Sequence, residues 1–582
     1  MVKTARRLHD TRYLIYFPII CCILLNCASL SKFIGLKKDG PVEAISGMVV
    51  SAHPLASEVG IQILQEGGTA VDAAVATAFA LGVVEPYHSG IGGGGFMLIR
   101  FAESGEVISI DFRETAPSQA HRETYVRDGE VVEEWSTVGA KAAAVPGLVA
   151  GLCLALREYG TLSLEQVLSD AEQYARSGFR VWNDYDRYAE SVLAELLQPG
   201  VAPFQFIMER ENPSKIDLSG EDYLLVQKDL ARTLGLIAEK GSDVFYRGEI
   251  AEKIADWMAE NNGLITQEDL ASYRPVLREP VRGTYRGYEI VSMPPPTSGG
   301  VNLLQMLNIL EGFDLNALGH NSPETIHLIT ETMKLAFADR AFFLGDPDFV
   351  DVPVEGLISK KYAEALRKKI DLHKASEIRN HGEPLDYSQK GGTTHISVID
   401  KQGNVVSLTQ TINLNFGAKV VVPGTGILLN NEMDDFSLQP GVPNAYNLIG
   451  GEANAIAPGK RPLSSMAPTI VLKDGKPYII VGSPGGPRII TTVLQVISNI
   501  IDHGLDIQKA VDAPRVHHQW LPDTLMVEKG ISDDVKELLI KMGHEVQQGG
   551  PLGAAQGILI DPQTGVYYGW SDPRLDGKAV GY

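Results

Sequence analysis

The pattern of apolar residues changes near Gly392. Before that point, segments with apolar residues three and four positions apart predict helices at 54–65, 70–83, 163–177, 322–343 and 360–373. After it, short alternating segments predict strands at 394–400, 405–412, 469–472 and 477–481, and a later apolar run predicts a helix at 489–503. Because helices flank the strands on both sides along the chain, we expect an α+β fold in which sheets lie between helices.

The turn at 401–404 sets the expected pairing of the first two strands. A register centred on Gln402 places Thr393 opposite Thr411, and the two-residue repeat of a strand puts Asn413 on the same face as Thr411. A hydroxyl and an amide would therefore flank Thr393. The ordinary alternative is that these threonines are there because threonine suits strands.

The dipeptide Asp474-Gly475 is a strong hairpin signal between the second pair of strands. A register centred on it gives two further pairs at the open end, Ser464 with Gly485 and Ser465 with Pro484. Gly485 and Gly486 then precede the helix expected at 489–503, where free backbone N–H groups can stabilise an oxyanion. A plain strand-to-helix turn is the alternative.

The net charge of the chain limits the kinds of partner that it can bind. A formal net charge of −21 argues against nucleic acid, because phosphate binding needs clustered Lys and Arg. No Cys/His cluster has the spacing of metal ligands, and Gly90–Gly95 is followed by a strand at 96–101, where a dinucleotide site would have a helix. We therefore expect no metal and no cofactor, and we interpret these glycines as a turn that lets backbones approach.

The first residues have the pattern of an export signal. Basic residues between Lys3 and Arg12 precede an apolar run at 13–25, which is shorter than the roughly 20 residues of a spanning helix. We expect removal of residues 1–26, a lipid anchor on Cys27, and location in the periplasm or cell envelope. An ordinary signal peptide and an uncleaved anchor are the alternatives.

Apart from Cys27, that mature chain would keep only Cys153, so no internal disulfide framework is expected. The apolar neighbours of Cys153 favour a buried structural role over a nucleophilic one.

The stretch Gly391–His395 places a Gly-Thr bond where a loop enters a strand. Cleavage before Thr393 would free an α-amino group whose ordinary pKa, about 7.7–8.0, suits it to act as general base for the threonine's own hydroxyl. This is the chemistry of an N-terminal nucleophile, although many loops enter strands through Gly-Gly-Thr without being cut.

Two other stretches suggest what such a nucleophile would act on. Asn430–Asp435 gathers amides and carboxylates that can hold an ammonium group, and Arg113 at a strand end can hold a carboxylate. A solvated acidic loop, and pairing of Arg113 with Asp111 or Glu114, are the ordinary alternatives. Together the two stretches describe a site for the α-amino acid end of a substrate.

With these motifs in place, the sequence resembles the γ-glutamyltranspeptidase family from about residue 44 to its end. The motifs that carry the resemblance are His53–Ser57, Gly67-Gly68, Ala70–Ala74, Gly92–Phe96, Pro294–Gly300, Ala338–Arg340 and the series from Thr393 to Pro487. Their number, order and spacing make a chance match very improbable.

The resemblance implies a four-layer αββα sandwich of the N-terminal nucleophile hydrolase type. It implies self-cleavage into a large chain, 27–392, and a small chain, 393–582, which stay together as a heterodimer. Thr393 would attack the γ-glutamyl amide of glutathione and related compounds and pass the acyl group to water, amino acids or dipeptides. The implied roles are Thr411 assisting Thr393, Gly485 and Gly486 in the oxyanion hole, Arg113, Ser464 and Ser465 at the α-carboxylate, Asn413, Glu432 and Asp435 at the α-amino group, and Tyr446 in a lid loop at 441–451.

Two competing hypotheses remain at this point. The first keeps the fold but changes the acyl group, as in related cephalosporin or glutaryl acylases; Arg113 with Ser464 and Ser465 favours an α-carboxylate substrate instead. The second is an uncleaved surface binding protein without catalysis, which the intact Gly392-Thr393 junction and the glycine pair disfavour.

Overall fold

The computed structural model describes residues 40–181, 183–192, 224–377 and 392–582. Within it, Val42–Tyr582 form one compact unit around two seven-stranded antiparallel sheets. The first sheet has the spatial order β1 (Val42–Ala44), β22 (Tyr567–Ser571), β21 (Gln556–Ile560), β17 (Lys476–Gly482), β16 (Thr469–Lys473), β11 (Tyr288–Ser292) and β10 (Val281–Tyr285). The second has the order β23 (Lys578–Gly581), β2 (Met48–Ser51), β12 (Gly392–Ile399), β13 (Val405–Asn413), β3 (Gly94–Arg100), β4 (Val107–Phe112) and β9 (Val276–Arg278).

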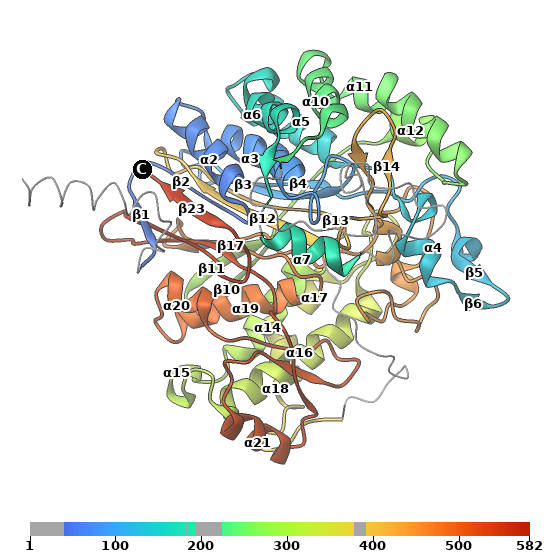
Figure 1. Cartoon of the computed structure of the whole chain (residues 1–582). Helices are drawn as coiled ribbons and strands as arrows, with labels where there is room; N and C mark the ends of the chain where they lie inside the picture. Colours follow the sequence, from blue (N-terminus) through green and yellow to red (C-terminus); the bar gives the residue numbers. More distant parts are fainter. Residues whose placement is uncertain (1–39, 182, 193–223, 378–391) are drawn as a thin grey trace, which may run out of the picture. The chain divides into compact units, whose positions relative to one another are not determined.

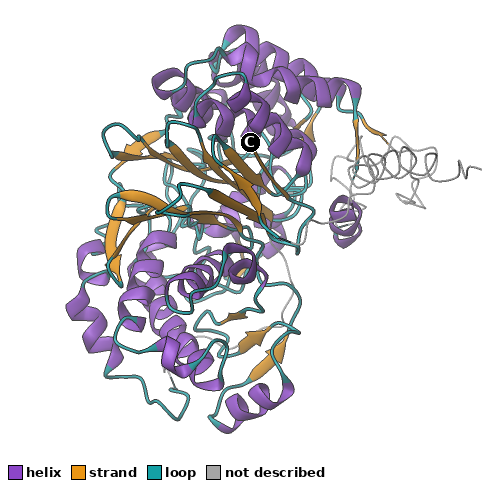
Figure 2. Ribbon diagram, turned by 90° about the vertical axis from the view of Figure 1, so that its left-hand side faces the viewer, coloured by secondary structure: helices purple, strands orange, loops and turns teal. Residues whose placement is uncertain are grey.

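Helices cover the outer face of each sheet, so the unit has four layers (Figure 2). The layer on the second sheet contains α2 (Pro54–Gln65), α3 (Ala70–Val84), α5 (Leu148–Tyr159), α6 (Leu164–Ser177), α10 (Lys228–Lys240) and α12 (Glu249–Glu260). The layer on the first sheet contains α14 (Gly299–Leu310), α16 (Pro323–Phe343), α18 (Lys360–Arg367), α19 (Arg488–Ile501) and α20 (Ile507–Asp512). The expected sandwich of sheets between helices is confirmed.

Shorter elements decorate this frame (Figure 1). The short helices are α4 (Glu133–Thr137), α7 (Asn183–Ser191), α11 (Asp243–Tyr246), α13 (Gln267–Ser272), α15 (Leu315–Leu318), α17 (Val354–Leu357) and α21 (Asp533–Lys541). Three short pairs are β5 (Val126–Arg127) with β6 (Glu130–Val131), β7 (Phe179–Arg180) with β8 (Leu224–Leu225), and β14 (Val421–Val422) with β15 (Ile427–Leu428). A small sheet joins β18 (Val516–His517), β19 (Leu525–Val527) and β20 (Val546–Gln548).

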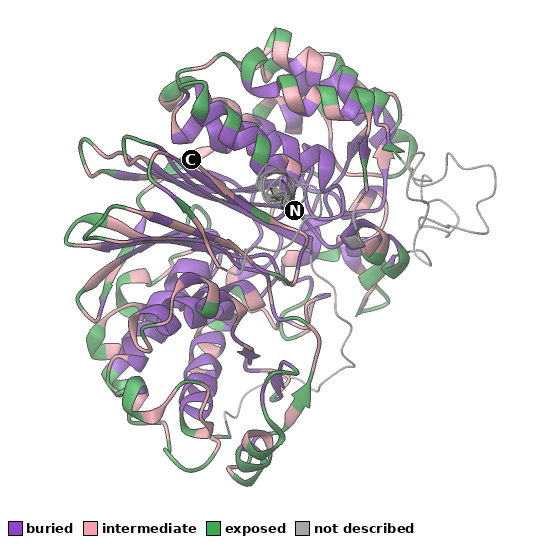
Figure 3. Ribbon diagram, turned by 60° about the vertical axis from the view of Figure 1, so that its left-hand side comes forward, coloured by how far each residue is buried: buried purple, intermediate pink, exposed green. Residues whose placement is uncertain are grey.

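Alternation along β12 sends its side chains to two different cores. Ile396 and Val398 join the apolar cluster under the helices of the second sheet. Ser397 points the other way, and its hydroxyl donates to the Gln556 carbonyl of the first sheet at 3.0 Å. Figure 3 shows the resulting burial of both sheets and of the helix faces turned toward them. By the same two-residue repeat, Thr393 lies on the face between the sheets.

The predicted helix boundaries hold where a cap or a glycine marks them. The helix expected at 54–65 is α2, and the one expected at 70–83 is α3, one residue longer. Ser163 and Ser322 are N-caps, so α6 and α16 begin one residue later than the predicted segments.

The helix predicted at 360–373 is wrong beyond Arg367. The next N–H groups bond only three residues back, Lys369 to Leu366 and Ile370 to Arg367, which ends the helix in a turn. That turn lets Ile370 pack on the apolar cluster of Ile309.

Strands from both sides of residue 392 interleave in each sheet. In the second sheet, β12 pairs with β2 on one edge and with β13 on the other, and β13 also pairs with β3. In the first sheet, β11 pairs with β16 and β1 with β22. A cut at 392–393 would therefore leave two chains held together by shared sheets.

The described residues contain no helix that is both long and apolar enough to cross a bilayer. The expected signal segment 1–26, Cys27 and residues 378–391, which end the loop before the Gly392-Thr393 bond, lie outside the described residues. The predictions about them are therefore neither supported nor opposed by the fold.

Candidate active site

Thr393 sits at an irregular point of a regular hairpin. The register predicted for this hairpin is confirmed, since Thr393 pairs with Thr411 and the pairing continues to Ile399 with Val405. A bulge falls between Gly392 and Thr393, so that Gly392 lies opposite Asn413. Bulges often re-aim side chains next to active sites. Here the bulge coincides with the Gly-Thr bond singled out from the sequence.

Thr411 contacts both partners of that bond. Its hydroxyl donates to the Gly392 carbonyl at 2.5 Å, and its oxygen lies 3.2 Å from the Thr393 hydroxyl. Because Thr411 has one proton and gives it to Gly392, the Thr393 hydroxyl is the donor between the two threonines. The Asn413 N–H donates to the same Thr411 oxygen at 2.8 Å. One buried threonine thus orients the Thr393 hydroxyl and polarises the carbonyl beside it.

The glycine turn at Gly90–Gly95 packs tightly against the backbone of Thr411 and Leu428. A Cβ on Gly93 would lie 2.0 Å from the Thr411 carbonyl, and one on Gly92 would lie 2.2 Å from the Leu428 carbonyl. β3 then begins at Gly94. The interpretation of these glycines as a close-approach turn is confirmed, and the turn packs directly against the backbone of Thr411.

Arg113 follows the end of β4, fully buried, and contacts three carboxylates. Its guanidinium forms ion pairs with Glu432 and Asp435, lies 3.5 Å from Glu114, and donates from Nε to the Pro462 carbonyl. Burial lowers the pKa of Arg113, but the Glu432 and Asp435 carboxylates outweigh it and raise that pKa overall. Burial raises the pKa of Glu432, and the neighbouring carboxylates Glu114 and Asp435 add to the rise. The guanidinium predicted to hold a substrate's carboxylate therefore contacts the two carboxylates predicted to hold its ammonium group.

Ser464 and Ser465 reach the site without being in the predicted register. β16 starts at Thr469, and Thr469 pairs with Val481, one residue away from the predicted partner. The reason is a bulge at Val471–Leu472: Pro477 has no N–H for the ladder, and the pairing skips Tyr478. The predicted pairs of Ser464 with Gly485 and Ser465 with Pro484 are therefore wrong.

Arg340 of α16 is a contact that the sequence did not reveal. It donates to the Ser465 hydroxyl at 3.3 Å and to the Ser298 hydroxyl at 3.0 Å. Burial lowers its pKa to about 10, so it still carries its charge at neutral pH. Because the contact spans 125 residues of sequence, only the Ala338–Arg340 motif hinted at its importance.

Tyr446 closes the site over Asn413. Its hydroxyl donates to the Asn413 carbonyl at 2.9 Å, and the Gln519 amide donates to the Tyr446 carbonyl at 3.0 Å. Burial, together with Asp435, keeps the pKa of Tyr446 well above its usual value, so the phenol stays a hydrogen-bond donor. Its ring also covers Gly486, where a Cβ would lie 2.5 Å from Cε1 of Tyr446.

One pocket collects all but one of the predicted site residues. Its lining includes Arg113, Thr393, Thr411, Asn413, Glu432, Asp435, Tyr446, Ser464, Ser465 and Gly486. The space left inside is only about 20 Å³, enough for about one water molecule. A substrate must therefore displace Tyr446 or separate the Arg113 ion pairs before it can enter.

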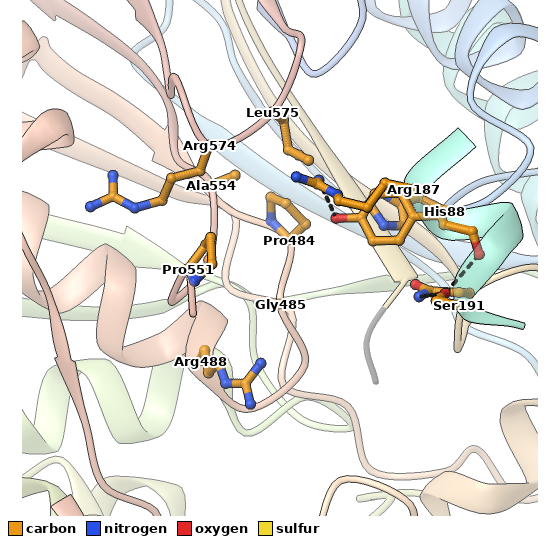
Figure 4. Close-up of a pocket in the computed structure, with 13 residues that line it drawn as sticks. His88, Arg187, Ser191, Pro484, Gly485, Arg488, Pro551, Ala554, Arg574 and Leu575 are labelled. Atoms are coloured by element: carbon orange, nitrogen blue, oxygen red, sulfur yellow. Dashed lines mark hydrogen bonds between the residues drawn. The ribbon is translucent and has the colours of Figure 1, made fainter. Parts of the chain in front are cut away.

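Gly485 faces a second cavity on the other side of the glycine pair (Figure 4). Gly485 and Gly486 both have positive φ, +130° and +57°, and they precede α19 as predicted. The second cavity has a volume of about 250 Å³, and its lining includes His88, Arg187, Tyr188, Asn415 and Arg488. The glycine pair thus lies between a filled polar pocket and an open one.

Cys153 lies on α5, away from both pockets, as expected. It is a free thiol packed against the apolar core. Burial raises its pKa to about 12, so it remains protonated and unreactive at neutral pH.

Comparison with known proteins matches residues 56–582 to the family model described as Gamma-glutamyltranspeptidase. The chain is also 49% identical over 559 residues to a glutathione hydrolase proenzyme of Escherichia coli strain K12, with 94% of each chain covered. The chain belongs to the γ-glutamyltranspeptidase family. It is therefore an enzyme, and the resemblance inferred from its motifs is confirmed.

Acylases also fall among the similar proteins. The chain is 43% identical to an Acylase ACY 1 proenzyme of Pseudomonas sp. strain SE83, with 93% of this chain and 94% of that one covered. The crystal structure of a cephalosporin acylase from Bacillus halodurans superimposes with a TM-score of 0.82 at 32% identity, over 94% of this chain and 98% of that one. The αββα fold of N-terminal nucleophile hydrolases is thus shared, and the acyl group must be decided from the site.

Proposed function

We propose that this γ-glutamyltranspeptidase cuts itself before Thr393 and then uses Thr393 to take γ-glutamyl groups from glutathione and related compounds. The observation that carries the proposal is the contact chain from the Thr393 hydroxyl through Thr411 to the Gly392 carbonyl. The products are a large chain, 27–392, and a small chain, 393–582, joined as a heterodimer. The word proenzyme in the names of the relatives supports this two-chain form.

In the first reaction the Thr393 oxygen attacks the carbonyl carbon of Gly392. The C–N bond breaks, the nitrogen keeps the electron pair and gains a proton, and an ester links Gly392 to the Thr393 side chain. Water then hydrolyses this ester, which leaves a carboxylate on Gly392 and a free α-amino group on Thr393. Thr411 stabilises the negative charge that develops on the Gly392 oxygen in the attack.

In the second reaction the substrate replaces the internal ion pairs. Its α-carboxylate binds Arg113, Ser464 and Ser465, and its α-ammonium group binds Asn413, Glu432 and Asp435. A zwitterionic α-amino acid end keeps the charge balance that Arg113 has with Glu432 and Asp435 in its absence. When such a group binds, every buried charge of the site therefore keeps a partner. A group with only one of the two charges would leave a buried charge of the protein without a partner.

Transfer then runs through an ester on Thr393. The freed α-amino group accepts the proton of the Thr393 hydroxyl, the hydroxyl oxygen attacks the γ-carbonyl, and the backbone N–H groups of Gly485 and Gly486 hold the oxyanion. The leaving amine takes the proton, and water or the amino group of an amino acid or dipeptide then breaks the γ-glutamyl ester. The arginine-lined cavity beside Gly485 has room for this leaving group and acceptor. The loop 441–451 with Tyr446 acts as the lid.

We also propose that the enzyme works outside the cytoplasm. The basic segment from Lys3 to Arg12 and the apolar run at 13–25 support export, and Cys27 supports a lipid anchor in the cell envelope. Mass analysis of the N-terminal peptide of the exported protein tests this. A lipid on Cys27 supports the anchor, an unmodified N-terminus near Cys27 leaves a soluble periplasmic enzyme, and an intact Met1 in the cytoplasm contradicts export.

A test of the acyl group compares glutathione with a glutaryl amide that has the same leaving group. A glutaryl chain keeps the terminal carboxylate and lacks the ammonium group, so Glu432 and Asp435 discriminate between the two, and Arg113 alone does not. A hydrogen bond to a charged group contributes about 1.5–3 kcal/mol, so losing the contact of the ammonium group with these carboxylates should make kcat/KM for glutathione at least about tenfold higher than for the glutaryl amide. Equal or reversed values would favour an acylase like the similar ones named above.

A further inference from the structure

A second cluster of buried polar residues, none of which lines the pocket of Thr393, lies where α16 packs against α21 (Figure 1). His327 and Glu331 are four residues apart on α16, so they share one face of that helix. His544 lies in the connection between α21 and β20. Their exposed fractions are 0%, 1% and 5%, although nothing in the proposed mechanism uses them.

The two histidines are already arranged as ligands. Nδ1 of His327 lies 2.7 Å from Nε2 of His544, and Nε2 of His327 lies 2.7 Å from the Asp371 carbonyl. Because a carbonyl can only accept, Nε2 of His327 carries its proton and Nδ1 presents a lone pair toward His544. A histidine that binds a metal through one nitrogen usually donates the other N–H to a carbonyl or carboxylate in just this way.

Glu331 completes the cluster. Its Oε2 accepts from the Ser376 N–H at 3.1 Å, while its buried Oε1 finds no hydrogen-bond partner among the described residues. The ligand atoms of Glu331 and the two histidines all lie within 4.8 Å of one another. A buried carboxylate oxygen without a donor is costly unless a cation meets it.

The neighbouring lysine does not supply that cation in full. Lys334 Nζ lies 3.4 Å from Oε1 of Glu331 but only 2.8 Å from Oδ1 of Asp523. One ammonium group is thus shared by two carboxylates, and it lies closer to Asp523, so the charge of Glu331 is only partly compensated. A divalent cation between the histidines and Glu331 would compensate it.

We propose that His327, Glu331 and His544 bind one Zn²⁺ through Nδ1, a carboxylate oxygen and Nε2, with water as the fourth ligand. Two imidazoles and a carboxylate suit zinc, and Zn–N distances of about 2.0–2.1 Å in a tetrahedral site place the two nitrogens about 3.3 Å apart. The observed 2.7 Å must therefore open by about 0.6 Å. A small rotation of the His544 ring provides this.

The ion would also join the two halves of the protein. His327 and Glu331 precede residue 392, and His544 follows it, so under the self-cleavage proposed above the ligands belong to different chains. In that case the zinc strengthens the association of the cleaved chains. The zinc site itself does not depend on cleavage, and its measurement stays informative if the chain is never cut.

The test measures zinc in the purified protein after treatment with a chelator and titration with ZnSO₄ alone. Glu331→Gln keeps the shape of the side chain and removes the charge, and His327→Ala removes a ligand. His503→Ala is the matched control, because His503 and His320 form a similar ring pair, with centroids 5.1 Å apart, and neither belongs to the proposed site. Circular dichroism verifies that each variant is folded, and self-cleavage of the E331Q variant should be unchanged.

We expect one tightly bound Zn²⁺ per protein in the wild type and in H503A, and affinity lower by at least about tenfold in E331Q. Co²⁺ bound to the wild type should show the strong visible absorption of a tetrahedral site with nitrogen ligands, and this band should be lost in H327A. Zinc should raise the urea concentration at which the cleaved chains separate. No zinc in the wild type, or equal affinity in E331Q, would overturn the proposal, and unchanged chain separation would overturn the link between the chains.

Discussion

Replacing Thr411 by valine tests how the chain cuts itself. Valine keeps the shape of threonine but cannot donate to the Gly392 carbonyl, which accepts the Thr411 hydroxyl at 2.5 Å at a site where Thr411 is only 4% exposed. Loss of one preorganised oxyanion donor slows acyl transfer by about 10²–10³, or about 2.7–4 kcal/mol. The Asn413 N–H also loses its acceptor, which lowers the free energy of unfolding by about 1–3 kcal/mol. The expected slowing of self-cleavage is thus large enough to be distinguished from the loss of stability.

The assay follows the uncut chain by intact-mass spectrometry after cell-free synthesis, with circular dichroism to confirm folding. Thr411→Ser is the matched control, because it keeps the hydroxyl and loses only the methyl group. We expect self-cleavage of T411V to be about 100-fold slower or more, and that of T411S to stay within about tenfold of the wild type. A folded T411V that cuts itself at the wild-type rate, or a T411S as slow as T411V, would refute this role for the hydroxyl.

Three further predictions concern the binding pocket, the glycine pair and the buried histidines. Arg113→Lys keeps the charge but loses the planar fork, so KM for a γ-glutamyl anilide should rise about 10- to 100-fold in steady-state assays; an unchanged KM would contradict carboxylate binding there. Gly486 has a φ of +57°, and the Cβ added by Gly486→Ala would press against the Tyr446 ring. The kcat/KM of this variant should therefore fall by at least about tenfold. Normal activity would contradict the placement of Gly486 and Tyr446 in the active site. Burial lowers the pKa of three histidines to about 3. Below pH 6.5 the unfolded state therefore binds protons that the folded state cannot bind. The free energy of unfolding is kept above pH 6.5 and falls as the pH drops toward 3, by about 2 kcal/mol per histidine at pH 5. The urea midpoint should drop between pH 7.5 and 5, and a flat profile would contradict neutral burial of these residues, which are His53, His395 and His517.

The hairpin that carries Thr393 could be predicted from the sequence because its turn sets the register. Between Thr393 and Ile399 each residue keeps its predicted partner, since nothing in either strand interrupts the hydrogen bonds. The helices with a serine cap or a glycine stop were predicted for a similar local reason. Local sequence signals were therefore sufficient to predict the register of this hairpin and the ends of these helices.

The predicted register of the second hairpin was wrong, and the reason is also local. Pro477 cannot donate to the ladder, and the pairing shifts by one residue. The prediction that Ser464 and Ser465 lie near the glycine pair nevertheless holds, because both serines and Gly486 line the same pocket. The predicted position of the two serines was therefore correct, although the register used to predict it was wrong.

Contacts between distant segments could not be predicted from one sequence. Arg340 meets Ser465 across 125 residues, and His327 meets His544 across 217. The pairing of Arg113 with Glu432 and Asp435 was missed as well, because each side was expected to wait for a substrate charge. In the substrate-free fold, buried opposite charges within reach pair with each other, since leaving them apart would cost more.

The most direct test is intact-mass analysis of the purified protein beside Thr393→Ala. We predict two chains in the wild type, the lighter one running from Thr393 to Tyr582, together with γ-glutamyl transfer or hydrolysis. We predict a single uncut and inactive chain in T393A. A wild-type chain that stays whole but active, or a T393A that is cut or active, would contradict the assignment of Thr393 as the nucleophile of both reactions.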